Sequence, residues 1–431
     1  MAYHQREVEC MPYGEMKALQ SARLVDAVGR AYGGVARFRE LMGLKGLGPG
    51  DVKGVDDLCR LPFTEKSDLR DAYPYGMLAV PIGRVVQLHS TSGTTGKRTL
   101  AFYTERDLDK WADCCARAIR AAGGGPDDVV QISYGYGLFT GGEGLNAGSR
   151  KVGCLSLPMS SGNTERQIQF MEDLGTTILC CTPSYAAYLA EALAAKGALG
   201  GLRLKVGIFG AEAWSEGMRV EIERALGIKA LDIFGLAEIM GPGVSFECLE
   251  QSGMHVNEDH FLAEVVDPVT LEQLPYGSEG ELVLTCLTNE ALPFIRYRTR
   301  DICVLTRDAC PCGRTLARIS RLMGRSDDML IVKGINVFPS QIESVLIEGG
   351  MAPNYQIIVD RLGHTDSLEV RVEMTEGLFD DTVKGIKGKE GALAESLRSM
   401  LGISAKVTMV AARSIERSEG KAVRVIDRRK L

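Results

Sequence analysis

Short apolar segments alternate with helix-forming stretches in the middle of the chain, and this alternation constrains the fold more than any other feature. Apolar runs at 177–182, 205–209 and 230–234 predict short buried strands. After the first run, Pro183 opens an alanine- and leucine-rich stretch, where proline suits the first turn of a helix. After the second, the spacing predicts a helix over Ser215–Leu226 that is capped by its first residue. This rhythm indicates an α/β fold with a mainly parallel sheet flanked by helices, whose ligands bind beyond the carboxyl ends of the strands.

The pattern changes after about residue 325, where the polar turn Gly324–Asp328 separates two apolar regions. We therefore predict a large domain over 1–325 and a small α+β domain over 326–431. The small domain is expected to contain helices at 339–346 and 391–401 and strands at 355–360, 367–374 and 405–410.

Composition excludes several classes of protein. The 431 residues carry 50 Lys and Arg against 56 Asp and Glu, so the formal net charge is -6, which argues against a general nucleic-acid binder. The sequence has no apolar run of the roughly 18 residues that a transmembrane helix needs. The N-terminal residues are polar and lack the apolar core of a signal peptide. We expect a cytoplasmic protein that binds neither nucleic acid nor membranes.

A segment rich in glycine, serine and threonine, His89–Arg98, points to a phosphate ligand. Small residues let backbone N–H groups approach phosphate oxygens, hydroxyls add donors, and Lys97 supplies charge. The segment is not a Walker A loop, because Gly93 and Gly96 are separated by two residues and Arg98 follows the lysine. Taken alone, such a run is equally compatible with an ordinary polar turn.

Ser92–Lys97 resembles the phosphate loop of the adenylate-forming superfamily, which includes acyl-CoA synthetases, peptide-synthetase adenylation domains and luciferases. Segments similar to the other motifs of that superfamily follow in order, at Gly210–Glu212, Phe234–Glu238, Tyr297–Asp301, Gly324–Asp328 with Val332–Asn336, and Gly420–Lys421. Leu61–Thr64 and Cys310–Gly313 look most like the phenylacetate–CoA ligase branch. Phe234 and Ala237 depart from the commoner residues of relatives, and each departure removes a hydroxyl.

The resemblance implies roles for the charged residues. Lys421 is expected to stabilise the charge that develops when two anions react, and Glu238 to hold Mg²⁺. Taken alone, the lysine would be a solvated side chain of a basic tail and Glu238 a helix-capping carboxylate. Asp327 is expected to act as the hinge between the domains, although an ordinary interdomain turn is the alternative.

The resemblance also implies a set of ligand contacts. Asp301 is expected to accept hydrogen bonds from both ribose hydroxyls, and Lys333 and Gly334 to face the channel for the coenzyme A thiol. The full set expected to bind ATP or AMP is Ser92, Gly93, Thr94, Thr95, Gly96, Lys97, Ala211, Glu212, Asp232, Phe234, Asp301 and Arg325.

The acid-binding pocket is predicted from a segment rich in glycine and aromatic residues, Tyr134–Gly141. By resemblance, Tyr136 and Phe139 would lie beside an aryl ring. The other predicted pocket residues are Gly210, Ile239 and Pro242. Packing of these aromatic rings in the protein core is the alternative.

Cysteine and histidine spacing predicts a structural zinc site within 248–312. Cys310 and Cys312 supply two thiolates from one tight turn, and Cys248 precedes His255 by seven residues. Three cysteines and one histidine suit tetrahedral Zn²⁺ and leave no open coordination position. His260 competes with His255 as the fourth ligand, and reduced cysteines without a metal are the alternative.

Together these features predict an ATP-dependent acid–CoA ligase for an aryl or arylacetic acid, with ATP, Mg²⁺ and coenzyme A as cofactors and Zn²⁺ as a structural ion. The expected partners are a small carboxylic acid, ATP and CoA, and a homodimer is left open. One alternative is an adenylating enzyme with a non-CoA acceptor, similar to coenzyme F390 synthetase. A non-catalytic nucleotide-binding scaffold is the other.

Overall fold

The computed structural model describes residues 2–91, 99–326, 330–332, 335–352, 354–362, 365–374, 383–416 and 424–429. The chain divides into two compact units. The first contains Met1–Cys181, Gly197–Ala211 and Ile228–Arg321, and the second contains Thr182–Lys196, Glu212–Gly227 and Leu322–Leu431. The second unit thus combines two segments from the middle of the chain with its C-terminal part.

The first unit begins with helices and a small antiparallel sheet. The helices are α1 (Arg6–Glu9), α2 (Tyr13–Gly34), α3 (Ala36–Leu44) and α4 (Lys66–Asp71), with short 3-10 turns at Pro49–Asp51, Val55–Arg60 and Ile82–Arg84. The small sheet pairs β1 (Gln87–Ser90) with β2 (Leu100–Tyr103).

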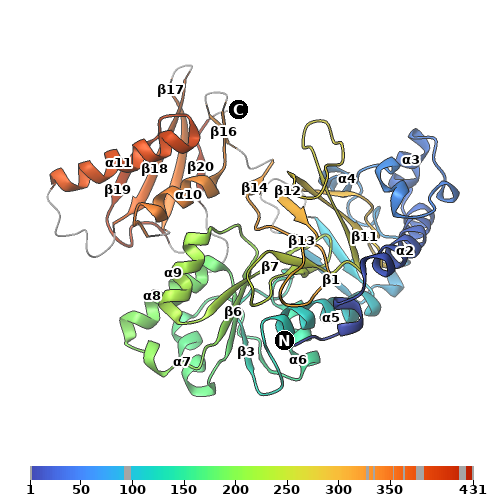
Figure 1. Ribbon diagram of the computed structural model, residues 1–431, viewed down its shortest axis with the longest axis horizontal. Coiled ribbons are helices and arrows are strands. Elements are labelled where there is room, and N and C mark those ends of the chain that lie inside the picture. The colour runs from blue at the N-terminus through green and yellow to red at the C-terminus, as the bar shows by residue number, and fades with distance from the viewer. Residues whose placement is uncertain are drawn as a thin grey trace. The chain divides into compact units, whose positions relative to one another are not determined.

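A large mixed sheet dominates the first unit (Figure 1). Its parallel half consists of β3 (Val129–Ile132), β4 (Leu155–Leu157), β5 (Ile178–Cys181), β6 (Val206–Gly210) and β7 (Lys229–Leu236). Its antiparallel half consists of β8 (Gly241–Phe246), β9 (Met254–Val256), β10 (Phe261–Val266), β11 (Glu279–Cys286), β12 (Tyr297–Thr306) and β13 (Arg318–Ile319). The strand order β10-β11-β12-β13-β9-β8-β7-β6-β5-β3-β4 puts the change from parallel to antiparallel pairing at β7.

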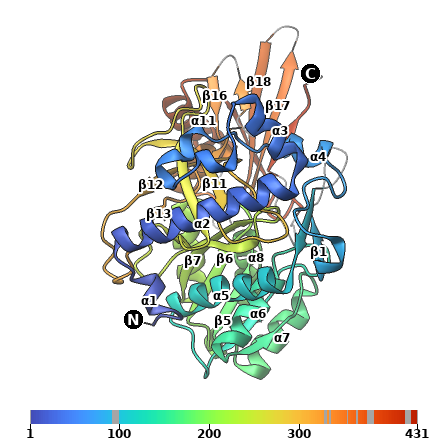
Figure 2. The ribbon, with the colours of Figure 1, turned by 90° about the vertical axis from the view of Figure 1, so that its right-hand side faces the viewer.

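Helices α5 (Glu105–Ala121), α6 (Glu143–Val152) and α7 (Thr164–Leu174) complete the first unit, and Figure 2 shows α5 and α6 side by side. Two glycines of α6 allow this close approach. A Cβ at Gly144 would lie 2.1 Å from Nε1 of Trp111, and one at Gly148 would lie 2.6 Å from Cβ of Cys115.

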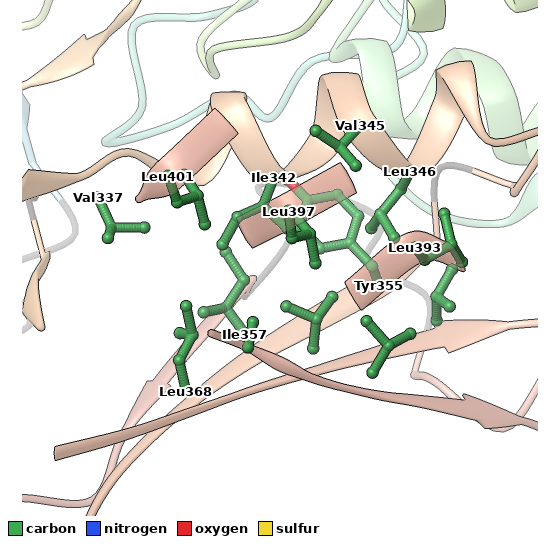
Figure 3. Close-up of a cluster of buried hydrophobic side chains, with 14 of the residues drawn as sticks. Val337, Ile342, Val345, Leu346, Tyr355, Ile357, Leu368, Leu393, Leu397 and Leu401 are labelled. Atoms are coloured by element: carbon green, nitrogen blue, oxygen red, sulfur yellow. The ribbon is translucent and has the colours of Figure 1, made fainter. Parts of the chain in front are cut away.

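The second unit contains α8 (Pro183–Lys196), α9 (Glu216–Leu226) and the C-terminal elements. These are β14 (Gly324–Arg325), β15 (Leu330–Val332), β16 (Ile335–Val337), α10 (Pro339–Glu348), β17 (Tyr355–Leu362), β18 (Thr365–Glu373), α11 (Val383–Leu401), β19 (Lys406–Val410) and β20 (Val425–Asp427). A four-stranded sheet has the order β19-β18-β17-β20. Figure 3 shows the apolar side chains of α10 and α11 packed on one face of that sheet.

The predicted α/β fold class is confirmed, and the strands expected at 177–182, 205–209 and 230–234 are β5, β6 and β7. The hydroxyl of Ser215 caps α9 by accepting a hydrogen bond from the backbone N of Met218 at 3.2 Å. The sheet is mixed rather than mainly parallel, because the strands after β7 are joined without intervening helices. Helix α11 begins at Val383, before the expected start at 391, although glycines occupy its first turns.

Among the described helices, none is both long and apolar enough to cross a membrane.

Candidate active site and cysteine–histidine cluster

The turn after β6 has an unusual backbone at the residues predicted to contact adenine. Gly210 is buried, and a Cβ there would lie 2.1 Å from the carbonyl oxygen of Ile233, so this position excludes a side chain. The next residue, Ala211, is exposed with φ at 71°, a left-handed conformation that alanine rarely adopts. Strained backbone of this kind is concentrated at ligand-binding turns.

Glu212 lies at the N-terminus of a helix. Within the second unit its Oε1 accepts a hydrogen bond from the backbone N of Ser184, at 2.7 Å, in the first turn of α8. A carboxylate is stabilised there by the unpaired N–H groups of the helix end.

The end of β7 and the turn into β8 carry the next predicted residues. Asp232 and Phe234 are both buried, and the backbone N of Asp232 donates to Oε2 of Glu247 at 2.8 Å. A Cβ at Gly235 would lie 1.7 Å from the carbonyl oxygen of Gly241, so the two strands approach each other too closely for any side chain. The turn between them therefore holds Glu238 at the carboxyl end of β7, where parallel pairing gives way to antiparallel pairing.

Glu238 is a buried carboxylate with two partners from distant parts of the first unit. Its Oε1 accepts a hydrogen bond from the hydroxyl of Tyr297 at 3.1 Å and lies 3.4 Å from Nζ of Lys66. The contact with Tyr297 joins two of the predicted motifs, 234–238 and 297–301. Sequence reasoning missed Lys66, although it lies two residues after Leu61–Thr64, a segment that carried only a family resemblance.

Asp301 lies at an irregularity between β11 and β12. The register places Glu281 opposite Ile302 but Val283 opposite Arg298, so β12 has extra residues that bulge from the ladder. Arg300 has φ at 69°, and the backbone N of Asp301 donates to Oγ1 of Thr299 at 3.0 Å. Bulges of this kind redirect a side chain, and this one directs the carboxylate predicted to bind ribose.

The residues predicted to line the acid pocket have different environments. Phe139 is 50% exposed, whereas Ile239 is buried and Pro242 is half-buried. Tyr136 is half-buried, its ring lies against Gly142, and its hydroxyl is buried with no hydrogen-bond partner among the described atoms. Burial and the charge of Glu143 raise the pKa of Tyr136, which stays a neutral phenol.

An aromatic group that sequence reasoning missed supports the turn after β7. Tyr103 stacks on Trp111 with 5.3 Å between ring centroids, and its hydroxyl donates to the carbonyl oxygen of Ala237 at 3.1 Å. Nε1 of Trp111 donates to the carbonyl oxygen of Pro242 at 2.8 Å. These two residues are far from the turn that they hold, at sequence separations of 134 and 131.

Several predicted residues lie outside the part of the chain that the structure describes. Arg325, by contrast, lies inside the described part, as a half-buried residue of β14 in the second unit. The residues outside the described part are Ser92, Gly93, Thr94, Thr95, Gly96, Lys97, Asp327, Lys333, Gly334 and Lys421.

The predicted metal ligands gather in one place within the first unit. The ligand atoms of Cys248, His255, Cys310 and Cys312 all lie within 4.8 Å of one another, and all four residues are buried. Sγ of Cys248 and Sγ of Cys310 are 3.8 Å apart, close to the roughly 3.8 Å edge expected for a tetrahedron with Zn–S bonds of about 2.3 Å. Sγ of Cys312 lies 3.4 Å from Nε2 of His255.

The competing histidine, His260, belongs to a different cluster. Its Nδ1 lies 2.9 Å from Oγ1 of Thr288, and its Nε2 lies 3.1 Å from Oδ2 of Asp259. Burial lowers the pKa of His260 to about 4, and the charges of Arg117 and Arg23 add to that effect.

In the cluster of Cys248, His255, Cys310 and Cys312, neighbouring groups favour the thiolate form of Cys312. Hydrogen bonding from Cys248 lowers the pKa of the Cys312 thiol, and His255 acts in the same direction. The backbone N of Arg314 also points at Sγ of Cys312, at 3.5 Å. The donor set and its spacing therefore fit a tetrahedral metal ion held by three sulfurs and one imidazole nitrogen.

Comparison with known proteins gives matches over nearly the whole chain. Two family profiles match, "AMP-binding enzyme" at residues 83–286 and "AMP-binding enzyme C-terminal domain" at 334–429. The phenylacetate–coenzyme A ligase of Escherichia coli (strain K12) is 47% identical over 98% of this chain and 97% of its own length. The corresponding enzyme of Thermus thermophilus is 44% identical over 99% of this chain and 100% of its own length.

A solved structure is also similar. A 2-hydroxyisobutyryl-CoA ligase in the postadenylation state with 2-HIB-AMP has a TM-score of 0.92 and 30% identity, and covers 98% of this chain and 92% of that one. The same ligase with 2-HIB-AMP and CoA in the thioesterification state has a TM-score of 0.72.

The chain therefore belongs to the phenylacetate–coenzyme A ligase family of AMP-binding enzymes. The family predicted from the motifs is confirmed, and so is the class of enzyme, an AMP-forming acid–CoA ligase.

Proposed function

We propose that this enzyme converts phenylacetate, or a closely related arylacetic acid, to its CoA thioester through an acyl-adenylate. The observation that carries the proposal is the 47% identity to a phenylacetate–coenzyme A ligase over 98% of the chain. The contact between Glu238 and Tyr297 supports it, because two motifs that serve one nucleotide would have to lie together.

The chemistry explains the residue types. A carboxylate is a poor electrophile, so its oxygen first attacks the α-phosphate of ATP and pyrophosphate leaves. The thiolate of coenzyme A then attacks the acyl carbon, and AMP leaves with the oxygen that joined it to the acyl group. The first step brings two anions together, so it needs cations directed at the developing charge.

We assign these tasks to residues of this chain. Lys421 supplies positive charge during adenylation, Glu238 is the ligand for Mg²⁺, and Asp301 accepts hydrogen bonds from the ribose. Thr94 and Thr95 bind phosphate oxygens together with the backbone of 92–97. The remaining assignments are adenine and nucleotide contacts at Ala211, Glu212, Asp232, Phe234 and Arg325, acid-pocket contacts at Tyr136, Phe139, Gly210, Ile239 and Pro242, a hinge at Asp327, and a thiol channel at Lys333 and Gly334.

A panel of carboxylic acids, assayed for AMP release with and without CoA, tests the reaction. We expect arylacetic acids to support AMP release, and we expect this release to require CoA. Release of pyrophosphate with turnover that is indifferent to CoA would instead assign another acceptor.

Comparison of the two half-reactions tests the role of Lys421. Lys421→Ala should suppress pyrophosphate release far more than it suppresses thioester formation from a supplied acyl-adenylate. An equal loss of both would contradict the assignment.

We further propose that Cys248, His255, Cys310 and Cys312 bind one structural Zn²⁺. Four protein ligands complete a tetrahedral shell, so the ion would stabilise the loops that carry them and take no part in the reaction. Metal analysis of protein purified without chelator should give about one zinc per chain, and protein free of zinc would contradict the site.

A further inference from the structure

The turn between β7 and β8 is held from outside through its carbonyl oxygens. Within the turn, the backbone N atoms of Ile239 and Met240 both donate to the carbonyl oxygen of Leu236 at 3.0 Å. Carbonyl oxygens of the turn and of the start of β8 accept hydrogen bonds from side chains of other segments, at Ala237, Ile239, Met240 and Pro242. Because these donors are side chains, substitution can remove each contact separately.

Asn289 is the donor at Ile239. Its Nδ2 lies 2.7 Å from the carbonyl oxygen of Ile239, which is 50 positions away in the sequence. Both residues are buried, with Asn289 8% exposed and Ile239 1% exposed. A buried carbonyl that loses its donor bears the full cost of desolvation, so the amide of Asn289 favours one position of this part of the turn.

The segment around Asn289 is itself fixed by a buried carboxylate at the start of α5. The two carboxylate oxygens of Asp107 accept hydrogen bonds from the backbone N of Glu290 at 2.8 Å and of Ala291 at 3.1 Å. Asp107 is 4% exposed and also accepts from the backbone N of Thr104, the N-cap residue of α5, at 3.1 Å. Asn289 therefore reaches the turn from a segment whose backbone is tied to a helix.

The same face of α5 also holds Pro242. Asp107, Trp111 and Cys115 are spaced four residues apart, so they lie along one side of the helix, and all three are buried. Nε1 of Trp111 and Sγ of Cys115 donate to the carbonyl oxygen of Pro242, at 2.8 and 3.2 Å. Burial raises the pKa of Cys115, so the thiol keeps the proton that it donates. One helix face thus supports the turn directly at Pro242 and through Asn289 at Ile239.

We propose that Asn289 is a positioning residue that fixes one wall of the acid pocket and so limits the size of the arylacetic acid that the enzyme accepts. The proposal rests on the proposed function, which places Ile239 and Pro242 in that wall. Asn289 acts through the backbone of Ile239, and no contact with the substrate is assigned to it.

The energies of packing explain why a hydrogen bond behind the wall would affect selectivity. One additional methyl group on a substrate changes its discrimination by roughly 10- to 200-fold in a well-fitted apolar pocket. That discrimination requires a wall that does not move, because a turn that can retreat leaves room for the larger ring. Tyr103 provides a second anchor, since its hydroxyl lies 3.1 Å from the carbonyl oxygen of Ala237 and 3.4 Å from that of Met240.

Asn289→Leu tests the proposal, with Gln20→Met as the matched control. Gln20 is 2% exposed, and its Nε2 donates to the carbonyl oxygen of Glu258 at 2.9 Å. Each variant replaces a buried amide that donates to a backbone carbonyl by an apolar side chain of similar size, but only Asn289 donates to the turn. We would measure kcat/KM for phenylacetate and for the ortho, meta and para tolylacetates, KM for ATP, and the melting temperature.

We expect Asn289→Leu to lower the preference for phenylacetate over the most strongly discriminated tolylacetate by about fivefold or more, and to leave KM for ATP within about twofold of the parent value. Tyr103→Phe, which loses only a hydroxyl, should lower the same preference. Gln20→Met should keep the parent preference even where its melting temperature falls.

An unchanged preference in Asn289→Leu would overturn the proposal, and so would an equal change in Gln20→Met, which would show a general loss of stability. If the leucine variant does not fold, Asn289→Ser, which keeps a shorter donor, takes its place under the same criteria. If the parent enzyme releases AMP with no arylacetic acid, the proposed function fails instead, so the two failures are distinguished.

Discussion

At the scale of single residues, the site depends on carboxylates held by long-range contacts. Glu238 is fixed by Tyr297 and Lys66, and Asp301 by a bulge next to a residue with positive φ. The partners of Glu238 come from distant segments and the bulge depends on pairing with β11, so the orientation of these carboxylates depends on the complete sheet.

We expect Glu238→Gln to lower the rate of adenylation by roughly 100-fold, the typical effect of losing one group that stabilises transition-state charge. The amide keeps the size of the side chain but cannot serve as an anionic ligand for Mg²⁺. Pyrophosphate release at saturating ATP gives the rate, and an unchanged melting temperature would show that the fold is intact. If Glu238→Gln adenylates at the rate of the parent enzyme, Glu238 is not a ligand of Mg²⁺.

His260 should make stability depend on pH. Burial lowers its pKa to about 4, below the roughly 6.5 of an unfolded histidine, so the folded protein prefers the neutral ring. The stabilisation is complete above about pH 6.5 and is lost as the pH falls toward 4, by roughly 3 kcal/mol in all.

Denaturant unfolding at several pH values between about 7 and 4.5 measures this dependence. His260→Gln cannot bind the proton and should flatten the curve in that window. An equally steep curve for the variant would assign the acid sensitivity to other groups.

At the scale of elements, two glycines determine how closely α6 packs on α5. Gly144→Ala would place a Cβ 2.1 Å from the buried indole of Trp111, so we expect a loss of about 1–3 kcal/mol in the free energy of unfolding. Because Trp111 supports the turn after β7, the Michaelis constant for the acid should rise as well.

Gly29 in α2 provides the control, since a Cβ there meets nothing within 4 Å. Gly29→Ala should stabilise the protein by about 0.5–1 kcal/mol through helix propensity alone. Thermal unfolding of both variants tests this prediction. Similar changes in melting temperature for Gly144→Ala and Gly29→Ala would contradict the packing argument.

The elements also show how far sequence reasoning reaches. Local signals were enough for β5, β6, β7 and the cap of α9, because apolar runs and capping residues act over a few positions. The antiparallel half was not anticipated, since pairing between strands such as β9 and β13 depends on partners about 60 residues apart.

The site shows the same division. Motif residues such as Glu238 and Asp301 could be identified from the sequence because each lies in a short contiguous motif. Lys66, Tyr103 and Trp111 could not, because each acts through a contact with a distant segment and has no motif of its own. The choice of His255 over His260 near the three cysteines likewise needed the fold.

At the scale of the whole molecule, the N-terminal segment is tied to the cysteine–histidine cluster. The hydroxyl of Tyr3 donates to the carbonyl oxygen of Cys312 at 2.8 Å, and Nε of Arg314 donates to Oε2 of Glu9 at 2.7 Å. Loss of a metal from the cluster would therefore loosen the first residues of the chain as well as the loops at 248–255 and 310–312.

Chelation should thus have two effects. We expect dialysis against a zinc chelator to lower the melting temperature by several degrees, and to make the segment before residue 12 sensitive to limited proteolysis. Mass spectrometry of the fragments, with and without restored Zn²⁺, makes the comparison. If the chelator changes neither the melting temperature nor the pattern of proteolytic fragments, a structural ion is ruled out.

The pairing of Glu9 with Arg314 also has a consequence for biosynthesis. The two residues are 305 positions apart, so Glu9 leaves the ribosome long before the arginine that pairs with it has been translated. Until then Glu9 has only its local hydrogen bonds from the backbone N of His4 and Gln5 and lacks its ion-pair partner, so this contact of the first unit forms only after residue 314 has been made. Residues near Glu9 are thus translated long before the last of their native contacts can form.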